Sequence, residues 1–598
     1  MFYILEFGGQ HTDLIGNRLR DMGFDVRYAE SDARIPELRD ASGIIISGGP
    51  KSVSNGYPHD PALFSSRVPV LGICYGMQLL GKHLGAGIHR RTREYGETRM
   101  SILDDSDLFH GLGSDGIVWM NHGDSVTHDG DFTTLAMTEK GVPAAMRSGN
   151  LYGVQFHPEV THTENGREIL RNFAERVCGQ EPGEMKEEGF DAGAFIDEAV
   201  RCLREEAGDR TALILTSGGV DSTVAAKLAQ MAGVRRQHAY LESGNGRKGE
   251  AAYVSGTIGH LLDAEIYIHV RRQMFLDALY GIHEPEQKRK LFADLYASAR
   301  HDMERLFEED EYVLVQGTIA TDRRESGKEA GKGRSRDSGT AAIIKTHHNT
   351  RAEDTWRGAT VSPLAELTKD MVRMVARKLG LPGELSERQP FPGPGMFIRY
   401  ATGFHSYGRG LEDSASDIAA SYGLEGHVLP RKGVGLKGDD RAFEHAALLA
   451  GGRDWDNVRA ASKSIIEDTD VCRVLYLPHE MRFKPGHFME SGDYPMTERT
   501  LERLREVTDV VESTMRDHDV QSSQTPVITF GGPDGWINVI RDVQSEDFRT
   551  LRPLRKPGEF PWECYDEIDR RLRERLGGEA GMTTFDVSDK PGGTTEWE

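Results

Sequence analysis

The sequence predicts a multidomain α/β protein whose last third is α+β, and three features of the pattern carry this prediction. Short apolar strands alternate with helical stretches over residues 1–180. A second alternating region runs from about residue 190 to 385, and the rest of the chain has more strand signals and a weak internal repeat. Alternation of strands with helices indicates parallel sheets covered by helices. We therefore expect two parallel-sheet domains followed by tandem α+β subdomains.

Composition and cysteine use place the chain among large globular proteins. Its 598 residues are too many for one core, and 38% of them are apolar against 28% charged. No apolar run approaches the length of a membrane span, and residues 1–8 indicate a strand rather than a signal peptide. Five widely spread cysteines argue against a disulfide framework. We therefore expect a cytoplasmic protein with no membrane partner.

The charge balance disfavours nucleic acid as a partner. The formal net charge is −22, whereas general nucleic-acid binding needs a basic surface. Only 19 of the 73 basic residues are lysine. An acid excess with scarce lysine suits a protein that works in high salt, which is a hypothesis that activity measured against KCl concentration tests.

The elements of the N-terminal part follow from its apolar runs and helical spacing. The predicted elements are strands Met1–Gly8, Ile44–Ile46 and Val68–Ile73, and helices Leu14–Asp21 and Met77–Leu84.

Cys74 lies between a predicted strand and a predicted helix, in the sequence Gly72-Ile73-Cys74-Tyr75-Gly76. This is the thiol counterpart of a nucleophile elbow, in which a sharp turn exposes the nucleophile beside a helix N-terminus. Such a position lowers the pKa of a cysteine and supplies backbone donors for an oxyanion. A buried structural cysteine is the alternative interpretation.

A thiol nucleophile needs a base, and His157 and Glu159 follow the apolar strand Tyr152–Gln155. In an extended segment residues i and i+2 share a face, so Glu159 can orient His157. A histidine satisfied within the core is the alternative. The occurrence of both motifs in this order favours a Cys74–His157–Glu159 catalytic site.

A glycine-rich loop follows the predicted strand Ala212–Thr216 and precedes a helix expected to open at Thr223. Backbone N–H groups and a helix N-terminus then face one concavity, which suits an anion with several oxygens. The Walker ending Gly-Lys-Ser/Thr is missing. The loop resembles the pyrophosphate loop of enzymes that cleave ATP between its α and β phosphates. The residues expected to face the anion are Ser217, Gly218, Gly219, Val220, Asp221, Ser222 and Thr223.

Three further motifs have roles that the pattern alone leaves open. The cations at 288–290 follow a turn, and composition alone favours a solvated charged face. His347 and His348 are adjacent, and neighbouring residues on a strand or turn rarely ligate one ion, so zinc there is the less favoured interpretation. The segment 390–395 holds three prolines, which fix φ and exclude a helix.

The internal repeat lies in the last third. Strands are expected at 473–478 and 582–587, each after an amphipathic helix, at about 455–467 and 562–576. Two related βαβ-like subdomains in tandem would explain this pattern.

The N-terminal part resembles the class I glutamine amidotransferases, on the segments 46–50, 72–76, 93–96, 119–124 and 156–160. The resemblance implies a flavodoxin-like fold in which Cys74 attacks the side-chain amide of glutamine, giving a γ-glutamyl thioester and ammonia. It also implies that Gly48 and Gly49 supply oxyanion-hole backbone and that Gln78 helps to hold glutamine.

With the pyrophosphate loop and the segments 284–290, 316–326, 390–395, 434–441, 589–591 and 594–598, the whole chain resembles the glutamine-hydrolysing GMP synthases. The resemblance implies an adenine-nucleotide α-hydrolase-like domain that adenylylates XMP with Mg·ATP and releases pyrophosphate, after which ammonia displaces AMP. Mg²⁺ would come with ATP, with Asp221 as its candidate protein ligand, and no tightly bound organic cofactor is expected. The residues that the resemblance places at XMP are Arg289, Asp439, Gln524, Lys590 and Glu596.

The chain departs from the family pattern at several positions. Glu242-Ser243-Gly244 replaces Asp-Asn-Gly, Gln389 replaces a histidine, and Arg323 and Arg324 replace apolar residues. A paralogue that aminates a modified purine nucleotide therefore stays open as an alternative. A catalytically silent regulatory protein is disfavoured by the intact catalytic residues, and sulfur insertion into tRNA is disfavoured by the acidic balance.

The expected domains are residues 1–182 (glutaminase), 190–387 (ATP pyrophosphatase), 388–482 and 483–598 (dimerisation-type subdomains, the second with the XMP-binding tail). About 110 residues exceed the short form of the family, as in its longer members, whose dimerisation subdomain is duplicated. An internal pair can satisfy the dimer surface within one chain, so we expect a monomer or at most a weak dimer.

Overall fold

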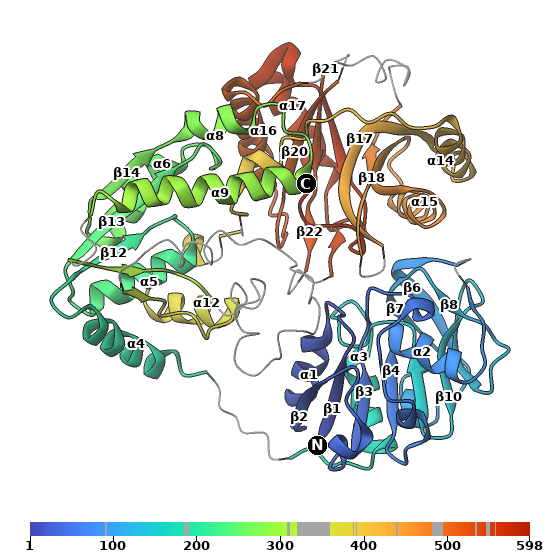
Figure 1. The fold of residues 1–598 in the computed structure, drawn as a ribbon. Coiled ribbons are helices and arrows are strands. Elements are labelled where there is room, and N and C mark those ends of the chain that lie inside the picture. The colour runs from blue at the N-terminus through green and yellow to red at the C-terminus, as the bar shows by residue number, and fades with distance from the viewer. Residues whose placement is uncertain are drawn as a thin grey trace.

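The computed structural model places three large sheets in successive parts of the chain, with the two-stranded pairs β5-β8 and β22-β23 beside them (Figure 1). Several short segments and the long segment 320–358 fall outside the description, so the sequence motifs at 316–326 and 347–348 are wholly or partly outside it. The described residues are 1–89, 92–183, 190–307, 311–319, 359–386, 388–389, 391–437, 440–480, 494–532, 535–545, 550–556 and 558–597.

The first sheet has nine strands in the order β2-β1-β3-β4-β11-β10-β9-β6-β7. The five strands β2-β1-β3-β4-β11 are parallel, and this is the strand order of a flavodoxin-like sheet, as expected. The predicted strands and helices lie here within a few residues of their expected bounds. The elements are β1 (Phe2–Glu6), α1 (Thr12–Arg20), β2 (Val26–Glu30), β3 (Gly43–Ile46), β4 (Val70–Ile73), α2 (Tyr75–His83), β5 (Ile88–His89), β6 (Glu94–Ile102), β7 (Asp115–His122), β8 (Ser125–Val126), β9 (Thr133–Thr138), β10 (Pro143–Ser148), β11 (Leu151–Val154) and α3 (Gly166–Asn172).

The second sheet is parallel throughout, in the order β14-β13-β12-β15-β16. Its central strand β12 carries the glycine-rich loop at its carboxyl end, where ligands of open α/β sheets bind. The elements are α4 (Ala192–Ala207), β12 (Thr211–Leu215), α5 (Val220–Met231), β13 (Arg236–Glu242), α6 (Glu250–Tyr253), α7 (Gly259–Leu262), β14 (Ile266–Val270), α8 (Arg272–Leu279), α9 (Pro285–Glu304), β15 (Tyr312–Val315), β16 (Thr360–Val361), α12 (Lys369–Lys378) and α13 (Gly383–Ser386).

The third sheet has seven strands in the order β20-β21-β24-β19-β18-β17-β25. Each half is a helix, two antiparallel strands, a helix and a strand parallel to the second, so the expected repeat is present. The elements are α14 (Arg409–Ser421), β17 (Glu425–Lys437), β18 (Asp440–Ala450), α15 (Trp455–Asp468), β19 (Val471–Leu477), α16 (Glu498–Asp517), β20 (Val527–Gly532), β21 (Gly535–Ile540), β22 (Val543–Gln544), β23 (Arg552–Pro553), α17 (Trp562–Leu576), β24 (Met582–Asp586) and β25 (Gly592–Gly593).

The two halves of this third sheet meet as an antiparallel pair. The last strands of the two repeats, β19 and β24, pair with Leu475 opposite Asp586. The residues that open the two equivalent helices, Trp455 and Trp562, stack with ring centroids 4.3 Å apart and planes 13° from parallel. Equivalent positions therefore face each other across the junction, as in a two-fold dimer interface built within one chain.

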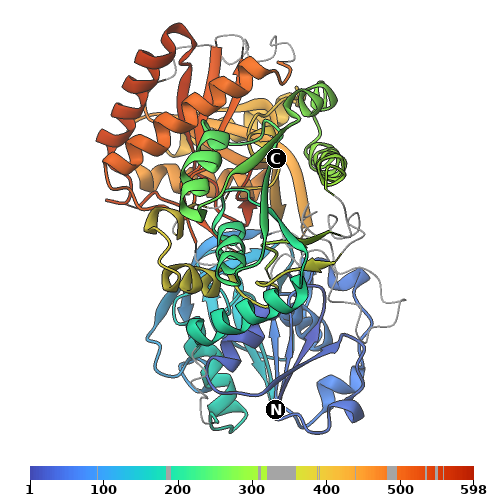
Figure 2. The same ribbon diagram turned by 90° about the vertical axis from the view of Figure 1, so that its left-hand side faces the viewer.

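Strand β6 of the first sheet lies against α15 of the third. The backbone N–H of Tyr95 donates to Glu467 (3.1 Å), and Lys140 reaches the same carboxylate (2.5 Å). Glu97 binds Arg459 (2.6 Å). In both views the N-terminal part lies below the C-terminal sheet, and Figure 2 shows them stacked along one direction. These ion pairs dock the first domain onto the subdomain that follows the second sheet.

Within the described part of the chain, no helix is long and apolar enough to cross a membrane.

Candidate active sites

Cys74 occupies a strained turn between β4 and α2. Its backbone has φ 52° and ψ −103°, and it is the residue immediately before the first helical turn. A positive φ is costly for a residue with a side chain, and such strain is concentrated at functional sites. The predicted nucleophile elbow is therefore the observed geometry.

His157 and Glu159 form the pair that the sequence predicts. Nδ1 of His157 lies 2.7 Å from Oε1 of Glu159, and both residues are buried. The segment bends after β11 instead of staying extended, so the side chains meet across a turn and not along one strand face. The expected contact is present, although the local conformation that creates it was predicted wrongly.

The electrostatics of this pair favour a charged imidazole. Burial by itself would lower the pKa of His157, but the Glu159 carboxylate and the Cys74 sulfur outweigh it and hold that pKa well above its usual value. Burial would likewise raise the pKa of Glu159, but His157 and His11 lower it to about 2. An imidazolium next to a cysteine stabilises the thiolate, which is the reactive form.

A backbone carbonyl and the side chain of Gln155, which the sequence analysis did not assign to the site, lie next to the Cys74 sulfur. The sulfur lies 3.7 Å from the carbonyl oxygen of Asn121, and Nε2 of Gln155 lies 3.6 Å from it. Gln78 donates to the carbonyl oxygen of Asp124 (2.8 Å), with the Gln155 amide oxygen 3.5 Å away. Gln78 is therefore linked to the thiol through Gln155, and its expected part in holding glutamine stays a prediction.

Gly48 and Gly49 follow β3, the strand next to β4. Ile46 is opposite Gly72 in this parallel pair, so Gly48 comes level with Cys74 at the carboxyl edge of the sheet. The hydroxyl of Ser47 donates to the Gly48 carbonyl oxygen (3.0 Å). The predicted oxyanion residues thus lie at the same sheet edge as the thiol.

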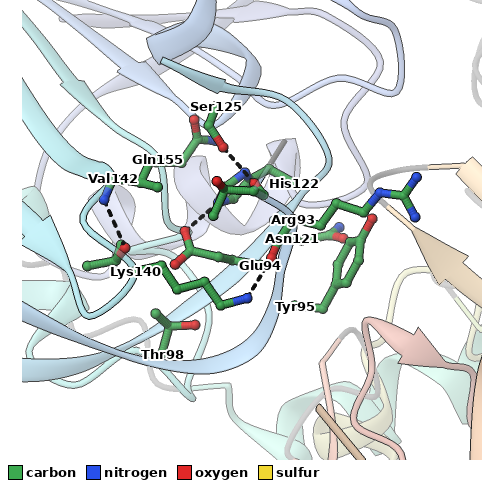
Figure 3. A network of polar contacts seen from close by, with 12 residues as sticks. Arg93, Glu94, Tyr95, Thr98, Asn121, His122, Ser125, Lys140, Val142 and Gln155 are labelled. Atoms are coloured by element: carbon green, nitrogen blue, oxygen red, sulfur yellow. Dashed lines mark hydrogen bonds and ion pairs between the residues drawn. The ribbon is translucent and has the colours of Figure 1, made fainter. Parts of the chain in front are cut away.

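A buried ion pair joins β6 and β7, the strands that carry the motifs at 93–96 and 119–124. Nε2 of His122, at the end of β7, lies 3.0 Å from Oε2 of Glu94, at the start of β6. Burial would raise the pKa of Glu94, but His122 outweighs burial and lowers it. Figure 3 shows the pair between Lys140 and Gln155. Nζ of Lys140 donates to the carbonyl oxygen of Arg93, the residue before Glu94 (3.1 Å), and also binds Glu467, so Lys140 links the start of β6 with the docking contact at α15.

The glycine-rich loop has the expected strand–loop–helix geometry, but α5 begins at Val220 and not at Thr223. Gly219 precedes the helix, and its carbonyl oxygen accepts from the Thr223 hydroxyl (2.9 Å). The Ser222 hydroxyl accepts from the N–H of Ser217 (3.2 Å) and so closes the loop. Asp221 therefore belongs to the first helical turn.

Glycines allow this loop to be compact. Gly218 has φ 78°, and a Cβ there would lie 2.8 Å from a methyl of Val254. A Cβ at Gly317, in the Gln316-Gly317 motif, would lie 2.7 Å from backbone atoms of Asp221 and Ser222. The Gln316-Gly317 motif is thus explained as a close backbone approach to the glycine-rich loop.

Two cationic side chains at this loop were not predicted from the sequence. Nζ of Lys369, the first residue of α12, lies 2.7 and 2.6 Å from the two carboxylate oxygens of Asp221. Arg388 donates to the Gly218 carbonyl oxygen (3.0 Å) and forms a bidentate pair with Glu250. The only local signal near Lys369 was Thr368, which caps the start of α12. Such a cap predicts where a helix begins but does not indicate a ligand-binding residue.

The residues expected at XMP are only partly brought together. Nε2 of Gln524 lies 3.3 Å from Oε1 of Glu596, whose carboxylate is held by Arg399 at 3.0 and 2.8 Å. Phe391, from the proline-rich segment, lies between Arg399 and Arg247, with the two guanidinium carbons 4.7 and 4.4 Å from its ring centroid. These contacts place one cluster at the junction of the second and third sheets.

The remaining residues of this set lie on other elements. Lys590 pairs through its backbone with Leu551, and Arg289 is half-buried near the start of α9. The neighbouring Lys288 is buried and donates to the Tyr400 carbonyl oxygen (3.2 Å), so the cations at 288–290 are not simply a solvated face. Asp439 lies outside the described residues.

Comparison with known proteins identifies the family. A family model described as glutamine amidotransferase class-I matches residues 3–177. The glutamine-hydrolysing GMP synthase of Geobacillus kaustophilus is 40% identical over 516 residues, covering 80% of this chain and 97% of that protein. The chain belongs to the glutamine-hydrolysing GMP synthase family. The GMP synthase of Syntrophomonas wolfei is 34% identical over 610 residues, covering 100% of this chain and 99% of that protein. The chain is therefore a glutamine-dependent ligase of GMP biosynthesis.

The GMP synthase pattern is altered at Gln389, and the structure gives this residue a role. Its amide nitrogen donates to the Ser522 carbonyl oxygen (3.2 Å), and its amide oxygen accepts from the Thr525 N–H (3.0 Å). Gln389 therefore holds the loop that carries Gln524. Likewise, Glu242 accepts from the N–H of Gly244 (2.9 Å) and so closes its own turn.

Proposed function

We propose that the chain makes GMP from XMP through an adenylyl-XMP intermediate, with ammonia supplied by its own glutaminase site. The purine C2 oxygen of XMP attacks the α-phosphate of ATP, pyrophosphate leaves, and ammonia then displaces AMP. Supporting this proposal is the presence, in one chain, of a strained thiol with its base and of an anion-binding loop at the end of β12.

The glutaminase roles follow from the thiol geometry. Cys74 attacks the amide carbon of glutamine, and His157, oriented by Glu159, passes the thiol proton to the leaving ammonia. The backbone of Gly48 and Gly49 stabilises the oxyanion, since these residues come level with Cys74. Gln78 contributes to glutamine binding from the first turns of α2.

The loop at 217–223 holds the leaving pyrophosphate. Its backbone N–H groups and the start of α5 stabilise negative charge, and the Lys369 ammonium, paired with Asp221, lies at the same place. The donor set suits a Mg²⁺ ion that arrives with ATP, because Asp221 provides one carboxylate and such ions usually keep few protein ligands. Mg²⁺ supplies charge neutralisation of the phosphates when it is bound.

XMP is proposed to bind where the third sheet meets the second. Gln524 and Glu596 offer an amide and a carboxylate to the base, and Arg289, Asp439 and Lys590 are the candidates for its remaining polar groups. Gln389 positions the Gln524 loop. We therefore propose that residues 1–182 bind and hydrolyse glutamine and that residues 190–387 bind ATP. Residues 388–482 and 483–598 would bind XMP.

The intermediate is tested with XMP labelled with ¹⁸O at C2. Attack by that oxygen on the α-phosphate leaves the label in AMP, so mass spectrometry of AMP should show one ¹⁸O for each GMP formed. Label that remains in GMP or appears in water would exclude the adenylyl-XMP route. Pyrophosphate release that depends on XMP gives an independent check.

A modified purine nucleotide is the second candidate acceptor because Glu242 and Gln389 depart from the family pattern, while the contacts of both residues within the chain favour XMP. Turnover of XMP is compared with that of base-modified analogues. Negligible turnover of XMP together with rapid turnover of an analogue would show that the analogue, and not XMP, is the acceptor.

Lys369→Met is expected to slow both glutamine-dependent and ammonia-dependent GMP synthesis by about 10²–10³-fold, since a preorganised charge at the transition state is worth that much. Glutamine hydrolysis measured without ATP should be unchanged. Lys378→Met, an exposed position on the same helix, is the matched control. Equal rates of GMP synthesis in Lys369→Met and Lys378→Met would show that Lys369 has no role at the proposed ATP site.

The chain is proposed to be a monomer because β19 and β24 pair the two subdomains internally. Light scattering at micromolar concentration is expected to give the mass of one 66.5 kDa chain. A tight dimer at that concentration would contradict the proposal.

A further inference from the structure

A second imidazole lies against the base of the thiol site. Nδ1 of His11 is 3.5 Å from Nδ1 of His157 and 3.6 Å from Oε1 of Glu159. His11 follows β1, whereas His157 follows β11, so their contact could not be predicted from the sequence pattern. Nothing in the glutaminase mechanism proposed above uses His11.

The three side chains form a buried group with unused ligand capacity. His11, His157 and Glu159 are 7%, 2% and 1% exposed. Oε2 of Glu159 has no hydrogen-bond partner among the residues that the structure describes. The nearby cation Arg18 donates to the backbone carbonyl of Glu159 and not to its carboxylate. Oε1 of Glu159 is the oxygen that lies near both imidazoles, and the unfilled Oε2 shows that this buried carboxylate has capacity for a further partner such as a cation or a water.

The geometry suits a small divalent metal ion. With sides of 2.7, 3.5 and 3.6 Å, the triangle of donor atoms has a point about 1.9 Å from each corner, close to the zinc–imidazole and zinc–carboxylate distances of ~2.0–2.2 Å. The two rings are nearly perpendicular, at 84°, so their ring nitrogens approach this point from different directions. Two histidines and one carboxylate form a zinc ligand set that leaves a further position open.

We propose that His11, His157 and Glu159 form an inhibitory site for zinc and related transition-metal ions. The ion replaces the proton between His157 and Glu159, and that proton is released to solvent. Metal on Nδ1 leaves the remaining ring proton of His157 on Nε2, so the ring no longer accepts the proton of Cys74. This inhibition rests on the proposed role of His157 as the base, whereas metal binding itself does not.

Binding is tested with Co²⁺, a spectroscopic substitute for zinc, added to the chelator-treated full chain. We expect d–d absorption from one bound ion without a thiolate-to-cobalt charge-transfer band. The absorption should persist in Cys74→Ala and disappear in His11→Gln and in His11→Phe, which keeps the ring volume. His128→Gln, an exposed histidine of the same domain, is the matched control.

Two spectral outcomes would overturn the proposal. Absorption unchanged in both His11 variants would remove His11 from the ligand set. A charge-transfer band that is lost in Cys74→Ala would place the ion between Cys74 and His157 instead. Because these spectra need no substrate, they are independent of whether the glutaminase mechanism is right.

The functional consequence is tested with Zn²⁺. Glutamine-dependent synthesis should be inhibited while ammonia-dependent synthesis continues, and His11→Gln should raise the inhibitory Zn²⁺ concentration at least about tenfold. The residual glutaminase activity of His11→Gln shows that the domain is folded. Equal inhibition of wild type and His11→Gln would refute the regulatory part of the proposal.

Discussion

Replacing Cys74 with alanine is expected to reduce glutamine-dependent GMP synthesis by more than about a thousandfold while ammonia-dependent synthesis continues. Cys74 is the proposed nucleophile that forms the thioester, because its strained backbone holds the sulfur beside His157. The loop that we propose binds ATP follows a strand of another sheet, so free ammonia can still serve as the nitrogen source. Product GMP is measured with saturating glutamine and, separately, with ammonium at a pH that supplies free ammonia.

Cys178→Ala is the matched control for this substitution. Cys178 lies in the same domain, and burial raises the pKa of its thiol to about 12, so it is a poor nucleophile. Both activities should stay at the wild-type level in this variant. Loss of ammonia-dependent synthesis in Cys74→Ala, or retention of glutamine-dependent synthesis, would contradict the separation of the two sites.

Local sequence patterns predicted the parts of the sites that one short segment builds. The Cys74 elbow and the loop at 217–223 each consist of a strand, a turn and a helix start, whose geometry follows from neighbouring residues. The order of the parallel strands also agreed with the expected fold. The repeat at 455–467 and 562–576 was visible because helix and strand recur in the same order.

Contacts between distant segments could not be predicted in this way. Lys369 meets Asp221 across 148 positions of sequence, and His11 meets His157 across 146. Which residues these side chains contact depends on how helices and strands pack. The sequence around a single lysine or histidine does not indicate such a distant contact. Gln389 is a further case, since as a departure from the family it suggested altered chemistry, whereas its contacts show that it holds a loop.

The buried charges of the third sheet could not be predicted either. Asp586, at the end of β24, is fully buried between Arg473 and Arg541, each 2.9 Å away. Arg473 also donates to the carbonyl oxygens of Thr594 and Glu596. One carboxylate thus holds two guanidinium groups, and one of these holds the C-terminal tail with the proposed XMP residue Glu596.

Asp586→Asn is therefore expected to destabilise the third sheet by about 3–5 kcal/mol, the usual cost of breaking a buried ion pair from one side. Two buried guanidinium groups would lose their counter-charge, and the tail would be released. Hydrogen exchange should increase at 471–477 and 592–597 and stay unchanged at 70–73, in the first sheet. The affinity for XMP should fall with the loss of the tail.

The destabilisation caused by Asp586→Asn is expected to depend on pH in one direction only. Burial would raise the pKa of Asp586, but Arg541 and Arg473 outweigh burial and hold it below the ordinary value of 3.8. A carboxyl group with a lowered pKa in the folded state stabilises that state above the unfolded pKa, and this stabilisation is lost as pH falls through the folded pKa. The difference in unfolding free energy between wild type and Asp586→Asn should therefore be constant near neutral pH and narrow only below about pH 4.

Asp566→Asn is the matched control, because Asp566 pairs with Arg453 where both side chains are exposed. An exposed pair is worth at most about 1 kcal/mol, so this variant should keep wild-type exchange in the tail. If Asp586→Asn were as stable as Asp566→Asn, the two arginines would be compensated by other groups. The tail would then be held by Trp597, which is buried and donates to the Lys432 carbonyl oxygen (3.1 Å), and not by the charge at Asp586.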